Sequence, residues 1–177
     1  MNQEYLQHLL RDVKEGRTDV DAALAQLQQL SPGELGFATI DNHRELRTGY
    51  PEVIFGQGKT PEQVAEIVSF MLTRGNNILA TRVSDAMAEK VQALCSDAVY
   101  NPTARTIAIT RREIPRPATY IALVTAGTSD LPVAEEAAVT AEIFGNRVER
   151  IVDVGVAGIH RLYNKLEVIR QARVIIV

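Results

Sequence analysis

Apolar residues recur at helical spacing in the first part of the chain. They fall into two series, Leu6, Leu9, Leu10 and Val13, then Val20, Ala23, Leu24 and Leu27. Gly16 ends the first series, and Thr18–Asp21 is typical of a helix start. The pattern predicts a helical hairpin over residues 1–30. Because neither helix is long enough to be stable alone, we expect the hairpin to dock on another surface or to support oligomerisation.

The next region is predicted to be a small α/β domain over residues 31–112. Residues 31–59 carry no sustained hydrophobic period, apart from a short strand at 53–55. A clear helix follows, with Thr60 as N-cap, Pro61 at the first helical position and Gln63 completing a capping box. The apolar pattern then predicts a strand at 77–81, a helix at 85–95 and two strands between 98 and 110.

A stretch rich in arginine and proline at 111–117 is interpreted as a linker. After it, apolar strands at 120–124, 148–154 and 173–177 alternate with helices at 131–144 and 160–171. This order predicts a parallel, doubly wound sheet over residues 118–177. Three strands alone leave apolar edges uncovered. We therefore expect either partners that complete the sheet or, as the favoured interpretation, a fragment of a longer protein that stops at Val177.

Composition narrows the function classes. A net charge of −3 argues against a general nucleic-acid binder. No apolar run approaches the roughly 20 residues of a membrane span, and no signal peptide follows Met1. The single cysteine, Cys95, fits a reducing, cytoplasmic setting. We expect Cys95 to be a core residue with no positive group beside it, and no His/Cys cluster has metal-ligand spacing.

Two loops that follow strands of the predicted parallel sheet carry candidate chemistry, because ligands bind at the carboxyl ends of such strands. The first holds Gly127, Thr128, Ser129 and Asp130, whose free amides and hydroxyls favour a phosphate; the alternative is a simple helix cap. The second brings His160 and Arg161 to a helix start. Histidine is the usual general acid or base near neutral pH and arginine binds anions, although a lone histidine is often structural.

The segment from Asp41 to Thr60 combines glycine, proline and basic residues. Its Gly-Lys-Thr ending lacks the upstream glycine of a phosphate-binding P-loop. Lys59, at a helix N-terminus, is a candidate phosphate contact, and the alternative is a turn with a solvated lysine.

Read as Asp-x-His-Arg-x-x-Arg-x-Gly-x-Pro-Glu-Val-Ile-x-Gly-x-Gly-Lys-Thr, this segment resembles the N-terminal signature of LarB, a family of nickel-pincer-cofactor biosynthesis proteins. Residues 124–177 resemble its domain related to PurE, an aminoimidazole ribonucleotide carboxylase. There, a Gly-Ser-x-Ser-Asp loop binds the ribose phosphate, and Ser-Ala-His-Arg carries the catalytic histidine. The corresponding segments here are one residue shorter, at Gly127–Asp130, and one residue longer, at Ala157–Arg161.

The resemblance implies an enzyme that carboxylates the pyridinium ring of nicotinic acid adenine dinucleotide with CO2 and hydrolyses its phosphoanhydride. The products are AMP and pyridinium-3,5-biscarboxylic acid mononucleotide. It implies His160 and Asp130 as catalytic residues, with substrate contacts from Gly127, Thr128, Ser129, Arg161, Arg44, Arg47, Lys59 and Thr60. The last four are expected to close over the dinucleotide.

The family's catalytic cysteine belongs beyond Val177, so the chain alone is expected to be inactive. The resemblance also implies a Mg²⁺ ion on the pyrophosphate and a homo-oligomer, an octamer as in the PurE relatives. The alternatives are a carboxylase or mutase acting on an imidazole ribonucleotide and a non-catalytic nucleotide-binding module.

Overall fold

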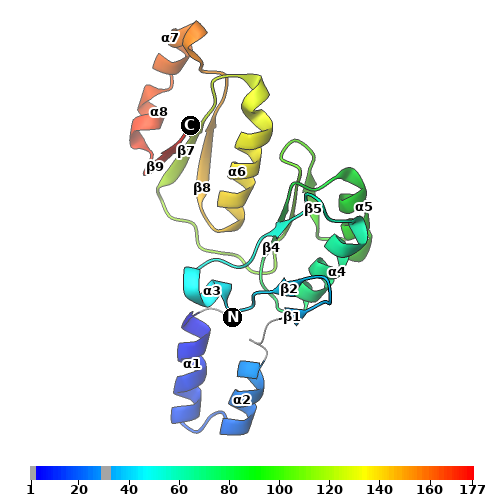
Figure 1. Cartoon of the computed structure of the whole chain (residues 1–177). Helices are drawn as coiled ribbons and strands as arrows, with labels where there is room; N and C mark the ends of the chain where they lie inside the picture. The colour runs from blue at the N-terminus through cyan, green and yellow to red at the C-terminus, as the bar shows by residue number, and fades with distance from the viewer. Residues whose placement is uncertain (1–2, 29–32) are drawn as a thin grey trace.

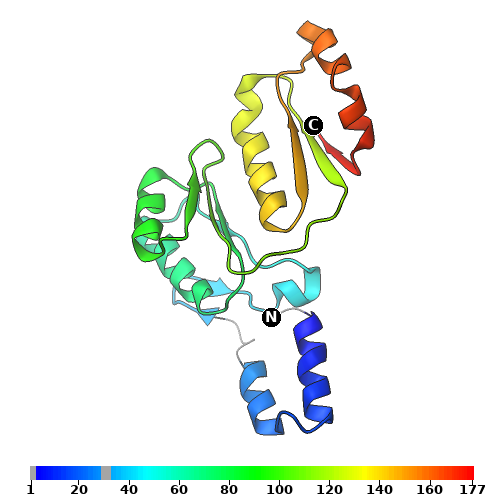
Figure 2. The same ribbon diagram turned by 180° about the vertical axis from the view of Figure 1, so that it is seen from behind.

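The structure is a computed structural model that describes residues 3–28 and 33–177. It contains a helical hairpin, a four-stranded mixed sheet and a three-stranded parallel sheet, each with its own helices (Figures 1 and 2). The predicted α/β class is confirmed. The ends of the predicted hairpin region, residues 1–2 and 29–30, lie outside the described residues.

The hairpin consists of α1 (Gln3–Lys14) and α2 (Val20–Gln28). Asp19 begins the second helix, because its Oδ1 accepts a hydrogen bond from the backbone N–H of Ala22 at 2.8 Å. Gly16 has φ +72, a left-handed conformation that ends α1 at low strain. Both views show the hairpin projecting away from the two sheets.

The aperiodic segment folds into very short elements. Antiparallel β1 (Gly33–Glu34) and β2 (Thr39–Ile40) come first, followed by α3 (Arg44–Thr48) and β3 (Ile54–Phe55). Two-residue strands and a five-residue helix are too short to show a period, which is why only β3 could be predicted.

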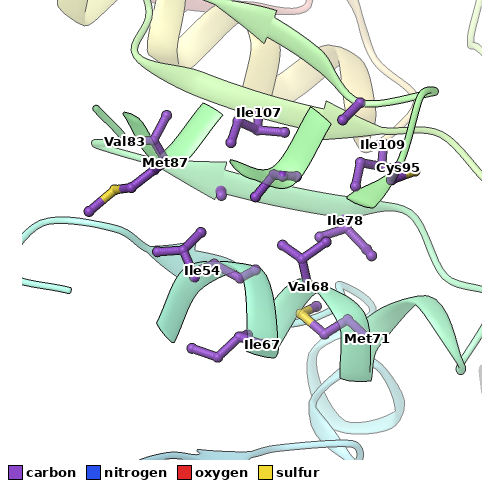
Figure 3. Packing of buried hydrophobic residues seen from close by; sticks show 14 of the residues in the cluster. Ile54, Ile67, Val68, Met71, Ile78, Val83, Met87, Cys95, Ile107 and Ile109 are labelled. Atoms are coloured by element: carbon purple, nitrogen blue, oxygen red, sulfur yellow. The ribbon is translucent and has the colours of Figure 1, made fainter. Parts of the chain in front are cut away.

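The mixed sheet has the strand order β3-β4-β6-β5, with β4 at Ile78–Thr81, β5 at Val99–Asn101 and β6 at Thr106–Ile109. Helices α4 (Pro61–Leu72) and α5 (Asp85–Leu94) cover one face. The Thr60–Gln63 capping box is confirmed, with hydrogen bonds of 3.0 and 3.2 Å. Figure 3 shows the resulting core, in which the helices meet Ile54, Ile78, Ile107 and Ile109.

The second face of this sheet packs on a helix of the C-terminal part. Leu79, Thr81, Thr106 and Ala108 alternate with the core residues along β4 and β6 and so point to this other face. Helix α6 (Leu131–Ile143) contacts β4 and β6 there, and it contacts the parallel sheet through its opposite side (Figure 1). Its alanine-rich sequence suits a helix packed between two sheets.

The parallel sheet has the order β8-β7-β9, with β7 at Tyr120–Val124, β8 at Arg147–Ile151 and β9 at Val174–Ile176. Helix α6 lies on one face, and α7 (Ile159–Tyr163) and α8 (Leu166–Gln171) lie on the other (Figure 1). The predicted doubly wound arrangement is confirmed.

The single helix predicted over 160–171 is wrong. The chain leaves α7 at Asn164, where the N–H of Lys165 bonds the carbonyl of Leu162 in a tight turn, and α8 then begins at Leu166. Asparagine is a weak helix former because its side chain competes with the backbone, and the apolar period continues through the break. The periodicity therefore gave no sign of the interruption.

A buried asparagine joins the two sheets. The Oδ1 of Asn77 accepts the backbone N–H groups of Arg111 and Arg112 at 2.8 and 2.9 Å. Its Nδ2 donates to the carbonyl of Arg112 at 3.0 Å and, more weakly, to that of Ile143 at 3.5 Å. Arg82 on the loop after β4 adds an ion pair with Glu136 of α6 at 2.6 Å. The linker is thus held against both parts.

Candidate active site

Two loops meet at the carboxyl ends of β7 and β8. Main-chain hydrogen bonds join them: the N–H of Val154 donates to the carbonyl of Thr125 at 3.1 Å, and the N–H of Gly155 donates to that of Ala126 at 2.9 Å. A Cβ on Gly155 would lie 2.8 Å from the Ala126 oxygen, so this close approach requires glycine. Parallel pairing and these bonds place the two predicted loops side by side.

The first loop leads through a short 3-10 turn, η1 (Thr128–Asp130), into α6. Asp130 Oδ2 accepts the backbone N–H of Gly127 at 2.9 Å, so the carboxylate folds back on its own loop. The side chains of Thr128, Ser129 and Asp130 are all exposed. The loop therefore starts a helix, as one of its two predicted uses requires, and its use as a ligand-binding loop stays a prediction.

The second loop runs from β8 through η2 (Val156–Gly158) into α7. Asp153 adopts a left-handed backbone, with φ +59, and its carboxylate forms an ion pair with Arg161. His160 is exposed at the start of α7. Sequence reasoning missed Asp153 as the partner that fixes Arg161. The signal was available as a carboxylate two residues after the end of β8 and eight residues before the arginine.

The first loop also borders the point where the chain changes direction in the sheet. The connection after β7 leads to β8 on one side of β7, and the connection after β8 leads to β9 on the other side. The crevice between β7 and β9 is therefore the switch point of the doubly wound fold. Ligands in such folds bind outside the carboxyl ends of the strands at that crevice. The loop of Ser129 and Asp130 follows β7, which borders this crevice, and the loop of His160 and Arg161 follows β8 on the other side of β7.

The four site residues predicted in the N-terminal part lie elsewhere. Arg44 and Arg47 belong to α3, which both figures place beside the segment leading into β7, at the end of the parallel sheet away from α7. Lys59 and Thr60 follow β3, at the carboxyl end of the β3–β4 pair. The predicted substrate contacts therefore lie in three separate places: at the carboxyl ends of β7 and β8, on α3, and after β3.

Three of these four side chains already have internal partners. Arg47 binds Asp41 at 2.5 Å, Lys59 Nζ donates to the carbonyl of Phe55 at 2.8 Å, and the Thr60 hydroxyl caps α4. The hydrogen bond from Arg47 lowers the pKa of the Asp41 carboxyl below its usual value. Arg44 is exposed.

The first part of the signature segment instead lines one side of a hollow of about 350 Å³ in the N-terminal part. Asp41, Glu45 and Glu52 line it together with Arg112. The buried carboxylate of Glu45 pairs with Arg112, and Glu52 Oε2 accepts the N–H of Asp41 at 2.5 Å. These contacts show that the signature residues bond chiefly to one another and to the end of the domain.

Cys95 is 7% exposed and belongs to the core of the mixed sheet, as predicted. The expectation that no positive group adjoins it is wrong, because Arg111 Nη2 lies 3.4 Å from Sγ. The arginine comes from the strand end after β6 and is distant in sequence, so only the fold reveals the contact. Cys95 lies on the domain that does not carry His160.

With this geometry in view, comparison with known proteins identifies the N-terminal part. Residues 33–112 match the family model described as LarB/PurE-like N-terminal domain. The N-terminal part is therefore similar to the N-terminal domain of LarB- and PurE-like proteins. The resemblance seen in residues 41–60 is thereby confirmed, since the match includes that whole segment.

A curated relative is an uncharacterised protein of Methanocaldococcus jannaschii, 34% identical over 134 residues. The match covers 72% of this chain and 52% of that protein, so the chain spans about half the length of the relative. In residues 3–28 and 33–177, no helix is long and apolar enough to cross a membrane.

Proposed function

We propose that this protein carboxylates the pyridinium ring of nicotinic acid adenine dinucleotide with CO2 and hydrolyses its phosphoanhydride. The products are AMP and pyridinium-3,5-biscarboxylic acid mononucleotide, for nickel-pincer cofactor synthesis in the cytoplasm. The observation that carries the proposal is the pair of bonded loops, which present Ser129 and Asp130 beside the loop of His160 and Arg161. The family match supports it.

Each residue has a role that its position permits. Ser129 and the amides of η1 are suited to a ribose phosphate, because a helix start presents N–H groups and a positive dipole end. Arg161, oriented by Asp153, offers a guanidinium to a second anionic group. His160 transfers the proton of the attacking water while the P–O bond of the phosphoanhydride breaks.

Ring carboxylation in this proposal uses a cysteine that adds to the pyridinium and makes it nucleophilic toward CO2. Cys95 does not fill that role, because it is buried in the other domain. Residues 1–177 alone are therefore expected to bind substrate without turning it over. Mg²⁺ is proposed to accompany the pyrophosphate, whose charge a cation offsets. Within the described ranges, no group of three or more His, Cys, Asp or Glu side chains is placed to bind a metal.

The test uses the complete gene product with nicotinic acid adenine dinucleotide and ¹³C-bicarbonate, followed by mass spectrometry. We expect AMP and a mononucleotide that has gained one labelled carboxyl group. His160→Ala is expected to slow the reaction by about a hundredfold or more, as loss of a general acid or base does. His8→Ala, which changes an exposed histidine on α1, is the matched control and should leave the rate unchanged.

Three outcomes contradict the proposal. Absence of both AMP and the labelled product would show that the protein does not catalyse the pyridinium reaction. Carboxylation or mutase activity on aminoimidazole ribonucleotide under the same conditions favours the imidazole ribonucleotide reaction instead, and tight binding with no turnover of either substrate favours a nucleotide-binding module.

A further inference from the structure

The hairpin of α1 and α2 leaves an apolar strip open to solvent. Leu9 and Ala23 are 5% and 7% exposed, whereas the residues directly after them, Leu10 and Leu24, are 63% and 53% exposed. Val20 is 70% exposed on the same helix as Leu24. The hairpin projects away from both sheets (Figures 1 and 2), so the rest of the described chain does not cover these side chains.

The exposed leucines point to the same side of the hairpin. Each follows a buried residue and so lies about 100° further round its helix. Leu9 and Ala23 face each other across two helices that run in opposite directions. A step of about 100° toward the C-terminus of each helix therefore places Leu10 and Leu24 on the same side of the hairpin. The half-buried Leu6, Val13 and Leu27 continue that strip between them.

Opposite charges border the strip. Lys14 lies one turn after Leu10 on the outer edge of α1, and Asp21 lies almost one turn before Leu24 on the outer edge of α2. Neither makes an ion pair with another described residue. Nearby Arg17 does, with Asp12 at 2.5 Å and with Glu15. Lys14 and Asp21 lie at the same level of the hairpin but on opposite outer edges.

We propose that this strip binds the same strip of a second copy, with α1 of one copy packed antiparallel on α2 of the other. A two-fold axis along the hairpin brings Leu10 of each copy against Leu24 of the other, and Lys14 against Asp21. The surface is then complementary to itself, as a two-fold interface requires. A four-helix bundle results, which explains how helices of 12 and 9 residues are stabilised.

The charge pair allows a test that separates contact between copies from contact within one copy. Lys14→Glu alone opposes two acidic residues across the interface, and Asp21→Lys alone opposes two lysines. Each variant of the full chain is expected to associate about tenfold more weakly in sedimentation velocity, because two favourable pairs become unfavourable. Mixing the two variants restores both pairs in the mixed dimer, so the mixture should regain wild-type association.

If the new charges instead act by repulsion within one chain, mixing the two variants should not restore association, because mixing changes no pair within a chain. A mixture that associates as weakly as each variant alone overturns the proposal, and so does a wild-type chain that sediments as a monomer at every concentration. Both results are independent of the carboxylation proposal, whose test measures only turnover.

A second pair of variants tests the apolar contact. Leu24→Glu is expected to weaken association by about a hundredfold or more, because it places a charge in the buried strip. Ala25→Glu introduces the same charge on the same helix about 100° away and should leave association unchanged. Equal effects of both variants contradict the proposed face, and circular dichroism checks that each keeps its helix content.

Discussion

The two sheets of this protein differ in how completely they are packed. In the mixed sheet, Ile78, Ile107 and Ile109 are at most 1% exposed, and both faces are covered by helices. In the parallel sheet, the residues of β9 are 39–49% exposed, and the cluster of buried residues is small, with Ala122, Val124, Ile151 and Val154. The better-packed sheet belongs to the domain that carries the family signature, whereas the loops with candidate chemistry extend from the less-packed one.

This difference indicates a division of roles between the sheets. Stability is expected to reside in the mixed sheet and in α6, which lies between both sheets. The candidate site is then built on a part with few buried contacts of its own, so its loops depend on α6 and on main-chain bonds for their position. The comparison can be tested by substitutions that act on each sheet separately and on the contacts between them.

The largest expected effect is in the mixed-sheet core. Ile107→Ala is expected to lower the free energy of unfolding by about 2–5 kcal/mol, because it leaves a cavity among fully buried side chains. Ile175→Ala makes the same chemical change in β9, where the side chain is half exposed, and should cost less than about 1 kcal/mol. Urea unfolding of both variants measures the difference, and equal costs would show that the sheets are equally packed.

A smaller effect is expected at the junction. Asn77→Ala removes the acceptor of two backbone N–H groups and should destabilise the protein by about 1–3 kcal/mol. Asn76→Ala, one residue earlier and half-buried, is the control and is expected to change stability by less than about 0.5 kcal/mol. Thermal unfolding compares the two, and an unchanged midpoint for Asn77→Ala would show that the network does not hold the sheets together.

The ion pair between Arg82 and Glu136 is a weaker link between the sheets. Both side chains are partly exposed, so a double-mutant cycle with Arg82→Gln and Glu136→Gln should give a coupling energy of about 0.2–1 kcal/mol. The coupling should shrink in high salt, since exposed charges are screened. A coupling near zero at low salt would leave Asn77 and apolar packing as the contacts that join the sheets.

The mildest test uses the pH dependence of Tyr100. Burial, and then the hydrogen bond to Asp85 at 2.6 Å, raises the pKa of the phenol to about 12. The unfolded chain ionises near pH 10, so the stabilising contribution is complete below pH 10 and is lost as the pH rises toward 12. Ultraviolet titration, with Tyr100→Phe as the reference, should show a late-ionising tyrosine. Ionisation of Tyr100 near pH 10 would show that the β5 edge is not packed as described.

The sequence predicts most of the regular elements because periodic patterns and caps act locally. The capping box at Thr60, the buried strand at Tyr120–Val124 and the parallel order after the linker all follow from residues close in the chain. The elements in residues 33–48 could not be predicted, because two-residue strands and a five-residue helix are too short to show a period. The break at Asn164 was missed because the apolar spacing continues across it.

The candidate site could be predicted only in part. The carboxyl-edge rule correctly brings Gly127–Asp130 and His160–Arg161 to one edge, because parallel strands end together. It says nothing of Arg44, Arg47, Lys59 and Thr60, whose positions depend on long-range contacts such as Glu45 with Arg112. The residues of the signature segment bond chiefly to one another and to Arg112, so the signature alone does not show where they lie relative to the other loops.

The most direct measurement is the mapping of ligand contacts by NMR. Titration of the ¹⁵N-labelled chain with nicotinic acid adenine dinucleotide should shift the amides of Gly127–Asp130 and of His160 and Arg161 most strongly. Much smaller shifts are expected around Asp41, Glu45 and Glu52, which line the hollow in the N-terminal part. The largest shifts in that hollow, with the carboxyl edge of β7 and β8 unchanged, would contradict the assignment of the site.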